Sequence, residues 1–306
     1  MFKLIKFIIG LVIFLVIAAI AFVITLVVIN WKNKPKKREV TYQHSVSEFS
    51  SLTVNVDVKD SYVEVVKSKN DKVTFTYYDS KTREFDNVKE DVDILNNSTV
   101  TLKSYQTGKW YNRIFFTLKG RSVYCVKVEV PEGVNINVKT DNGNIKFMEN
   151  LSVNTLTADT TNGSIKFDNV KATSVDVNTV NGEILATGTN ATELFKARTR
   201  KGLINVTNFT SISLVLVMDL STDSGNINVD ITNTVALANI KLHTGNGNIG
   251  GKVTVITDAL YKISANAHNG TVSEELRKKS SDLGISTLDL STDNGNIDLI
   301  INNMVA

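Results

Sequence analysis

Three histidines, one cysteine and three aspartates at a shared turn position are the residues of this 306-residue chain that could bind a metal or transfer protons. His243 and His268 fall at different positions of two neighbouring repeat copies, and His44 is far from both in sequence. A metal shared by these histidines is therefore not expected. Cys125 is the single cysteine, which excludes an intramolecular disulfide and a multi-cysteine metal site. We predict no metal and no cofactor.

The three aspartates are equally unsuited to catalysis. Asp141, Asp223 and Asp293 occupy the first, fifth and eighth copies of the repeat, and successive coils of a β-stack lie about 4.8 Å apart. They are too far apart to act as a paired acid and base. A polysaccharide lyase would also need aromatic platforms beside clustered carboxylates and a basic residue, whereas the outward positions of the repeat contain no aromatic residue. The sequence therefore predicts a protein that is not an enzyme.

One copy of the repeat carries a cluster of cations that could bind an anionic envelope polymer or a phosphate group. The four residues are Lys196, Arg198, Arg200 and Lys201. The alternative is a solvated basic face that is balanced by Asp176 and Asp219 in the neighbouring copies. A second candidate contact is the pair Trp110 and Tyr111, in an expected loop, which could contact a ligand or a membrane. Its alternative is an aromatic plug over the first coil.

The elements that position these residues follow from a repeat marked by glycine. Eight glycines are separated by 20, 19, 20, 23, 22, 23 and 25 residues, which is the period of a solenoid. They are Gly143, Gly163, Gly182, Gly202, Gly225, Gly247, Gly270 and Gly295. The residues seven and five before each glycine are apolar and those six and four before are polar, as in a strand with one buried face. A β-branched residue two positions after each glycine starts a second strand.

The turn between the two strands has the form Thr-x-Asn-Gly in most copies. Asparagine tolerates the left-handed region and glycine permits positive φ, so we expect a sharp corner there. Stacked antiparallel hairpins are an alternative, but identical inward positions and corners favour parallel stacking of coils in register. The corner threonine, which is replaced by Ala267 in one copy, would then form an inward ladder of hydroxyls that hydrogen bond between coils.

Three regions depart from this repeat. Residues 46–130 lack the glycine period but keep alternating apolar residues, which predicts an N-terminal β-region that starts and caps a solenoid over residues 131–306. The charged insertion Ser273–Gly284 is expected to hold a short helix. The last strand, Ile297–Ile301, is followed by only five residues, and an open strand edge templates further pairing. We therefore expect this end to self-associate or to bind a partner protein.

The N-terminal segment predicts a membrane anchor. Phe7–Ile29 is a run of 23 uncharged residues, about 34 Å long as a helix and long enough to cross a bilayer. Residues 1–6 form a short tail before it, and residues 30–45 form a polybasic linker after it. The alternative is a cleaved signal peptide with a small-x-small site at Ala19–Ala21. We favour a retained single-pass anchor with an extracytoplasmic body, although five cations after the run against two before it would place the body inside.

The charge distribution agrees with a membrane address rather than with nucleic-acid binding. The net charge of +3 combines seven cations and one acid in residues 1–39 with a remainder of −3, that is 27 cations minus 30 acids. A nucleic-acid-binding domain would be strongly basic, so this function is excluded. The cationic linker could lie against anionic lipid headgroups, or it could be a solvated spacer.

The turn sequences Thr-Asp-Asn-Gly-Asn-Ile at 140–145 and 292–297, and Thr-Asp-Ser-Gly-Asn-Ile at 222–227, follow an apolar anchor. In these features the chain resembles a bacterial family labelled "putative adhesin" or toastrack β-strand repeat, a domain of unknown function. The resemblance covers residues 46–302 and implies right-handed β-solenoids of envelope proteins, some of them linked to cell-envelope stress systems.

We therefore expect an all-β chain, namely a single-strand right-handed parallel β-solenoid of eight coils with an N-terminal β-rich cap region, preceded by one transmembrane helix. The expected function is that of a non-enzymatic, adhesin-like interaction module of the cell surface or envelope. The alternative is an accessory or sensor protein of an envelope stress signalling system.

Overall fold

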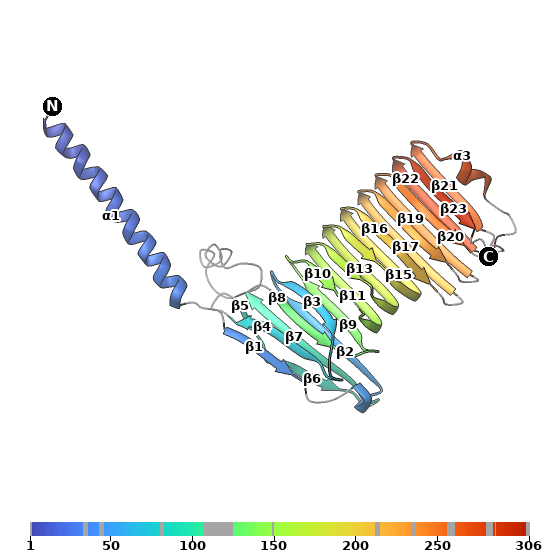
Figure 1. The fold of residues 1–306 in the computed structure, drawn as a ribbon, viewed down its shortest axis with the longest axis horizontal. Coiled ribbons are helices and arrows are strands. Elements are labelled where there is room, and N and C mark those ends of the chain that lie inside the picture. The colour runs from blue at the N-terminus through green and yellow to red at the C-terminus, as the bar shows by residue number, and fades with distance from the viewer. Residues whose placement is uncertain are drawn as a thin grey trace.

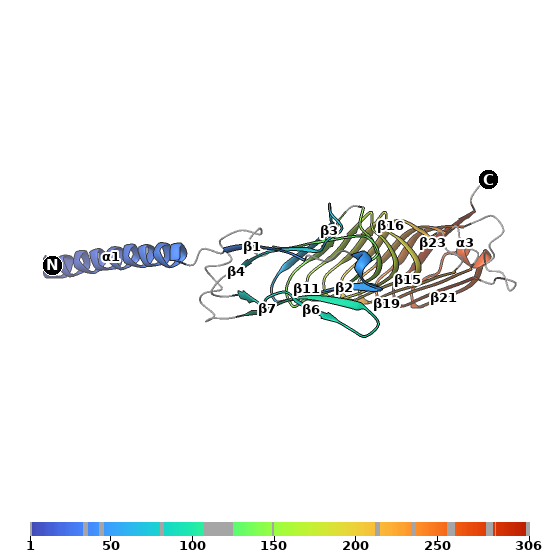
Figure 2. The ribbon, with the colours of Figure 1, turned by 90° about the horizontal axis from the view of Figure 1, so that it is seen from below.

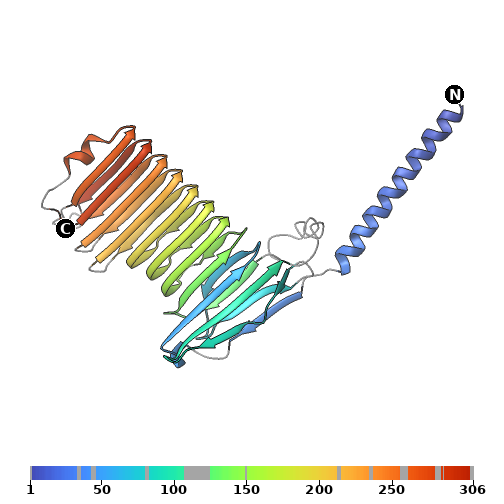
Figure 3. The same cartoon turned by 180° about the vertical axis from the view of Figure 1, so that it is seen from behind.

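The computed structural model describes residues 2–32, 36–42, 46–79, 83–106, 125–148, 150–211, 215–233, 237–255, 261–279, 284 and 286–303. An N-terminal helix, α1 (Phe2–Lys32), lies apart from an elongated β-body (Figures 1 and 2). The β-body is a stack of coils in which strands form two walls around a common core (Figure 3). The predicted parallel β-stack is therefore confirmed, while its right-handed turn stays a prediction.

One wall, the long-strand wall, is a row of parallel pairs. Its order is β7 (Asn97–Gln106), β2 (Ser51–Val58), β9 (Asn135–Thr140), β11 (Ser152–Asn162), β13 (Lys171–Asn181), β15 (Asn190–Lys201), β17 (Val215–Ser224), β19 (Leu237–Asn246), β22 (Ser286–Asn294) and β21 (Tyr261–Asn269).

The opposite wall, the short-strand wall, is also built from parallel pairs. Its order is β8 (Cys125–Val130), β3 (Tyr62–Lys67), β10 (Ile145–Phe147), β12 (Ile165–Asp168), β14 (Ile184–Thr187), β16 (Ile204–Ser211), β18 (Ile227–Asn233), β20 (Ile249–Val255) and β23 (Ile297–Asn303).

Four antiparallel strands close the N-terminal end of the stack. On the short-strand wall, β4 (Thr74–Asp79) pairs with β8, and β1 (Lys36–Thr41) pairs with β4. On the long-strand wall, β5 (Arg83–Phe85) and β6 (Lys89–Val92) pair with β7, and a 3₁₀ turn, η1 (Val46–Glu48), precedes β2. These four strands stand where the sequence predicts that the N-terminal β-region caps the solenoid. The predicted linker over residues 30–45 is wrong where β1 stands, because these residues are a paired edge strand.

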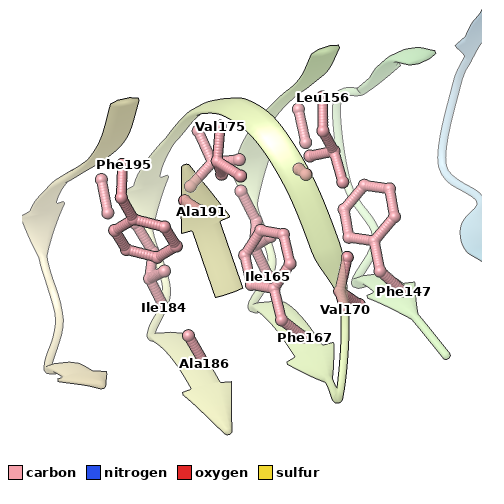
Figure 4. Close-up of a cluster of buried hydrophobic side chains, with 14 of the residues drawn as sticks. Phe147, Leu156, Ile165, Phe167, Val170, Val175, Ile184, Ala186, Ala191 and Phe195 are labelled. Atoms are coloured by element: carbon pink, nitrogen blue, oxygen red, sulfur yellow. The ribbon is translucent and has the colours of Figure 1, made fainter. Parts of the chain in front are cut away.

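Alternation along each strand builds the core. Val175 of β13 lies in register between Leu156 of β11 and Phe195 of β15, and all three are completely buried. Because every coil places its apolar residues at the same positions, like side chains stack on like. Figure 4 shows the result in the middle coils, where Phe147 stacks on Phe167 with ring centroids 5.1 Å apart. The alternative of stacked antiparallel hairpins is wrong for these coils.

The corner threonines form the predicted buried ladder, but their hydrogen-bond partners differ from those expected. Each hydroxyl donates to the backbone carbonyl of the turn residue in the adjacent coil rather than to another hydroxyl. Thr179 donates to Gly163 O at 2.9 Å and Thr199 to Gly182 O at 2.9 Å. The same bond is made by Thr140, Thr160, Thr222, Thr244 and Thr292. The ladder thus satisfies the threonine hydroxyls, which are buried beside the core.

The turn glycines are required for a different reason from the one predicted. Most of them do not have a positive φ; only Gly225 and Gly295, both at +153°, lie in the region that favours glycine. Instead, each turn approaches the previous turn so closely that a side chain cannot fit. A Cβ atom on Gly182 would lie 1.9 Å from the carbonyl oxygen of Gly163, and the other seven glycines show the same conflict with the neighbouring coil.

The coils do not stack in chain order at either end. β22 lies between β19 and β21, so the coil of Gly295 is inserted between the coils of Gly247 and Gly270. At the other end β2 lies between β7 and β9. The outermost described strand of the short-strand wall is therefore the last strand, β23, and that of the long-strand wall is β21. β23 pairs with β20, and α3 (Glu274–Lys278), the predicted short helix, packs beside it with Leu276 buried (Figure 2).

The side chains described in α1 are those of residues 10–25 and 28. Within the described part of the chain, no helix meets the combination of length and apolar character that crossing a membrane requires.

Candidate functional site

The predicted cation cluster lies on β15, in the middle of the long-strand wall. Its neighbours β13 and β17 place an aspartate beside each of the first two cations. Lys196 Nζ lies 3.4 Å from Asp176 Oδ2, and Arg198 donates to Asp219 Oδ2 at 2.9 Å. Arg200 and Lys201 are exposed at the turn, and no ion pair joins them to the described residues. Half of the cluster is therefore neutralised, as the balanced basic face predicts, and the uncompensated cations are the two at the turn.

The ion pair of Lys196 belongs to a longer charge ladder along the outer surface. Five successive strands, β13, β15, β17, β19 and β22, place oppositely charged residues at one register position. The residues are Asp176, Lys196, Asp219, Lys241 and Asp289. In-register parallel stacking brings the side chains of one position within about 5 Å of one another, so the alternating signs of this row give attraction rather than repulsion. The ladder thus specifies which coil stacks on which.

A second ladder of uncharged side chains follows the turns. Asn162 Nδ2 donates to Asn142 Oδ1 at 2.7 Å, and Asn181 Nδ2 donates to Asn162 Oδ1 at 2.8 Å. Lys201 and Ser224 replace asparagine in two coils, and the ladder of amides resumes with Asn246. Arg200 and Lys201 therefore stand at a gap in a regular amide row.

The candidate metal ligands do not converge. His243 on β19 shares a hydrogen bond of 2.9 Å with Ser291 Oγ on β22, and His268 lies on β21, one strand further away. The expectation that the two histidines lie in adjacent coils is thus wrong. Within the described ranges, no group of three His, Cys, Asp or Glu residues could hold a metal ion. His44, Trp110 and Tyr111 lie outside the described residues.

The aspartates at the shared turn position also stay separate. Asp223 and Asp293 lie on β17 and β22, with the coil of β19 between them. Asp141 instead accepts a hydrogen bond of 2.6 Å from Lys59 in the adjacent coil. This hydrogen bond, together with the charge of Asp141, raises the pKa of Lys59. The group is a surface ion pair rather than a reactive site.

One exposed feature is absent from the sequence predictions. The turn between β6 and β7 presents Ile94, which is fully exposed, and Leu95, which is 69% exposed. Asp93 orders the turn, because its carboxylate accepts hydrogen bonds from the backbone N–H groups of Leu95 and Asn97 at 2.8 and 2.9 Å. The amide and backbone N–H of Asn97 lower the pKa of Asp93. The signal in the sequence was two aliphatic residues between turn-forming Asp93 and Asn96.

The charge ladder leads to a stability prediction. Replacing Lys196 with Asp places three carboxylates in adjacent coils, and we expect a loss of about 1 kcal/mol in the free energy of unfolding at low salt. The matched control is Lys166→Asp, because Lys166 lies beside Lys146 and the new carboxylate would face a cation. Urea unfolding at low salt and at about 1 M salt measures both variants, and salt should reduce the loss. Equal effects of the two variants would contradict the ladder.

The chain is similar to three solved structures of bacterial proteins. Two solved structures are described as putative adhesins: one from Parabacteroides distasonis has 12% identity over 87% of this chain and 97% of that chain, with a TM-score of 0.44. The other, from Bacteroides fragilis, has 16% identity over 87% and 98%, with a TM-score of 0.43. A putative cell adhesion protein from Clostridium sporogenes has 14% identity over 88% and 100%, with a TM-score of 0.29. None of the curated proteins matches the chain.

The resemblance drawn from the turn sequences is confirmed at the level of the family. A family model described as Toastrack DUF4097 matches residues 50–300, and the chain therefore belongs to the toastrack family.

Proposed function

We propose that the chain is a non-enzymatic interaction module of the bacterial cell envelope, held at the membrane by α1 and adhesin-like in its role. The observation that carries the proposal is that the chain combines two different parts, an apolar helix and a polar β-stack. A β-stack, whose outward side chains pair with one another in ladders, follows a helix whose described side chains are exposed and, apart from Thr25, apolar. The first part offers an extended surface, and the second offers a means of attachment.

The proposed attachment to the membrane is through α1. Phe14, Ile17 and Phe22 are each at least 60% exposed and lie within the run of 23 uncharged residues. An apolar surface of this extent is unfavourable in water, since transfer to an apolar surrounding gains about 25 cal/mol per Å². A lipid bilayer would supply that surrounding, and β1 begins only a few residues after α1. Lys36 and Lys37 at the start of β1 would then lie near the lipid headgroups.

The proposal of an interaction role, rather than catalysis, is supported by how the charged groups are used. The acids on the long-strand wall mostly face cations of adjacent coils, as in the pairs of Lys196 with Asp176 and Lys103 with Asp57. These pairs distribute the charged side chains along the surface of the stack rather than gathering them at one position. A regular polar surface fits contact with an envelope polymer or with another protein.

Protease treatment of intact cells tests the proposal. We expect a C-terminal tag on the full chain to be lost when protease is added outside the cells, and the chain to stay in the membrane fraction after an alkaline wash. A variant with Val16→Lys and Ile17→Lys should leave that fraction, because charges at the centre of a membrane helix cost about 2.5–3.5 kcal/mol each. A tag protected in intact cells but lost after lysis would contradict the adhesin-like role and favour the alternative of an accessory in stress signalling.

A further inference from the structure

The outermost strand of the long-strand wall, β21, directs hydrogen-bonding groups away from the stack. In a parallel strand, alternate residues point their N–H and C=O to opposite sides. Asn269 O accepts a bond of 3.3 Å from Gly295 N, so Ala267 and Ala265 also face β22. The backbone N–H and C=O groups of Ser264, Asn266 and His268 therefore point away from β22. Among the described strands, β22 is the single pairing partner of β21.

The two ends of the stack are protected differently. At the N-terminal end, the edge strands β1, β5 and β6 read KKREVT, REF and KEDV, and such charges prevent strands from adding to an edge. At the other end, β21 carries one charged residue, Lys262 near its start, and residues 264–269 read Ser-Ala-Asn-Ala-His-Asn, without Lys, Arg, Asp, Glu or Pro. Ala265 and Ala267 are only half-buried there. The C-terminal end is thus the one prepared for a further strand.

We propose that this further strand is β21 of a second copy, paired antiparallel about a two-fold axis. A head-to-tail contact is disfavoured because it would need the charged N-terminal edge, whereas a two-fold contact uses the same edge twice and closes. With Ala265 opposite Ala265 of the second copy, Ile263 meets Ala267, so a large side chain faces a small one. Ser264 then faces Asn266, and both pairs keep the inward and outward alternation of the wall.

The helix at the same end is also self-complementary. α3 carries Glu274 and Glu275 in its first turn and Arg277 and Lys278 in its last. A two-fold axis beside β21 would run the two copies of α3 in opposite directions, with acids facing bases. Charge complementarity of this kind favours the correct partner and increases the association rate.

Pairing through β21 would also decide where the two α1 helices lie, and this step rests on the proposed membrane anchoring. α1 lies beyond the N-terminal end of the stack and β21 lies at the opposite end (Figures 1 and 2). Ten long strands span nine spacings, or about 43 Å. Pairing through β21 therefore carries the two α1 helices to opposite ends of the dimer, where they would enter two facing membranes. The second copy is then a copy on another surface.

A substitution that removes one outward N–H tests the pairing. Asn266→Pro deletes this donor but keeps the groups that face β22, and proline is tolerated at an edge strand in this orientation. Asn266→Ala is the matched control, because it loses the same side chain and keeps the N–H. We expect the full-length control in detergent to sediment as a dimer at a concentration where the proline variant is monomeric. Thermal unfolding of the two variants checks that both are folded.

Two further measurements separate the proposed contact from other kinds of association. In a Cys125→Ser background, Ala265→Cys should form an intermolecular disulfide on oxidation, because the two residues meet at the axis. Phosphatidylcholine vesicles carrying the full-length control should cluster, as followed by light scattering, and those with Asn266→Pro should not. Equal behaviour of the proline and alanine variants in either assay would overturn the proposal. Neither assay depends on which side of the cell membrane the stack occupies, so this failure is distinct from failure in the protease experiment.

Discussion

Replacing Gly182 with alanine is expected to destabilise the stack by about 3 kcal/mol or more, or to prevent folding. The new Cβ would lie 1.9 Å from the carbonyl oxygen of Gly163 and 2.5 Å from its carbonyl carbon. Both are backbone atoms, so no side-chain rotation relieves the overlap. The coils would have to separate, which would break the bond from Thr199 to Gly182 O and strain the strand pairs on both walls. Far-UV circular dichroism during urea or thermal unfolding measures the loss.

Gly250→Ala is the control for this prediction. Gly250 lies on β20 of the same stack, and its added Cβ would meet nothing closer than Asp298 O at 3.5 Å. We expect a change within about 0.5 kcal/mol. Because φ of Gly182 is not positive, backbone strain cannot produce the difference. A tolerated alanine at Gly182 would show that the coils are further apart than the structure places them.

The repeat of the toastrack chain could be predicted from its sequence because each coil solves the same packing problem. The apolar residues before each glycine define the inward face, and the corner threonine defines a buried polar position. The reason for the glycine could not be predicted, since a turn with positive φ and a close approach between coils both select the same residue. Only the position of Gly163 O relative to Gly182 distinguishes the two.

The order of the coils was hidden by the same regularity. When every coil presents the same inward positions, any coil can stack on any other, and chain order is the simplest assumption. Two departures from the repeat indicate the observed order of the coils. Ala267 lacks the hydroxyl that an internal coil uses, and Asp289 rather than Ser264 continues the alternating charges beside Lys241. Terminal repeats are usually atypical in this way, which identifies the coil of Gly270 as the cap.

The candidate site could be predicted in part. The pairing of Lys196 with Asp176 follows from counting register positions, whereas Arg198 pairs with Asp219 although its register partner on β17 is Ser221. The exposed turn at Ile94 could not be found by the same means, because it lies in an antiparallel cap that has no repeat. Exposure of an aliphatic side chain depends on which segments cover it, and a sequence without a repeat does not indicate those segments.

Disulfide trapping is expected to distinguish the observed coil order from chain order in an all-or-none manner. Asn239 on β19 and Thr287 on β22 are register partners, and Thr287 Oγ1 donates to Asn239 Oδ1 at 2.9 Å. Adjacent strands lie about 4.8 Å apart, within the range of Cα separations that a disulfide bridges. In a Cys125→Ser background, the pair Asn239→Cys and Thr287→Cys should therefore oxidise completely.

The matched pair is Asn239→Cys with Lys262→Cys on β21. Lys262 stands eight residues before Gly270, as Asn239 stands eight before Gly247, so stacking in chain order would make these two the neighbours. With β22 between them, their Cα atoms are about 9.6 Å apart, beyond the limit of about 7 Å for a disulfide. Counting free thiols in the denatured chain should find none in the first variant and two in the second. The reverse result would restore chain order, and it would also move the open edge from β21 to the strand of Thr287.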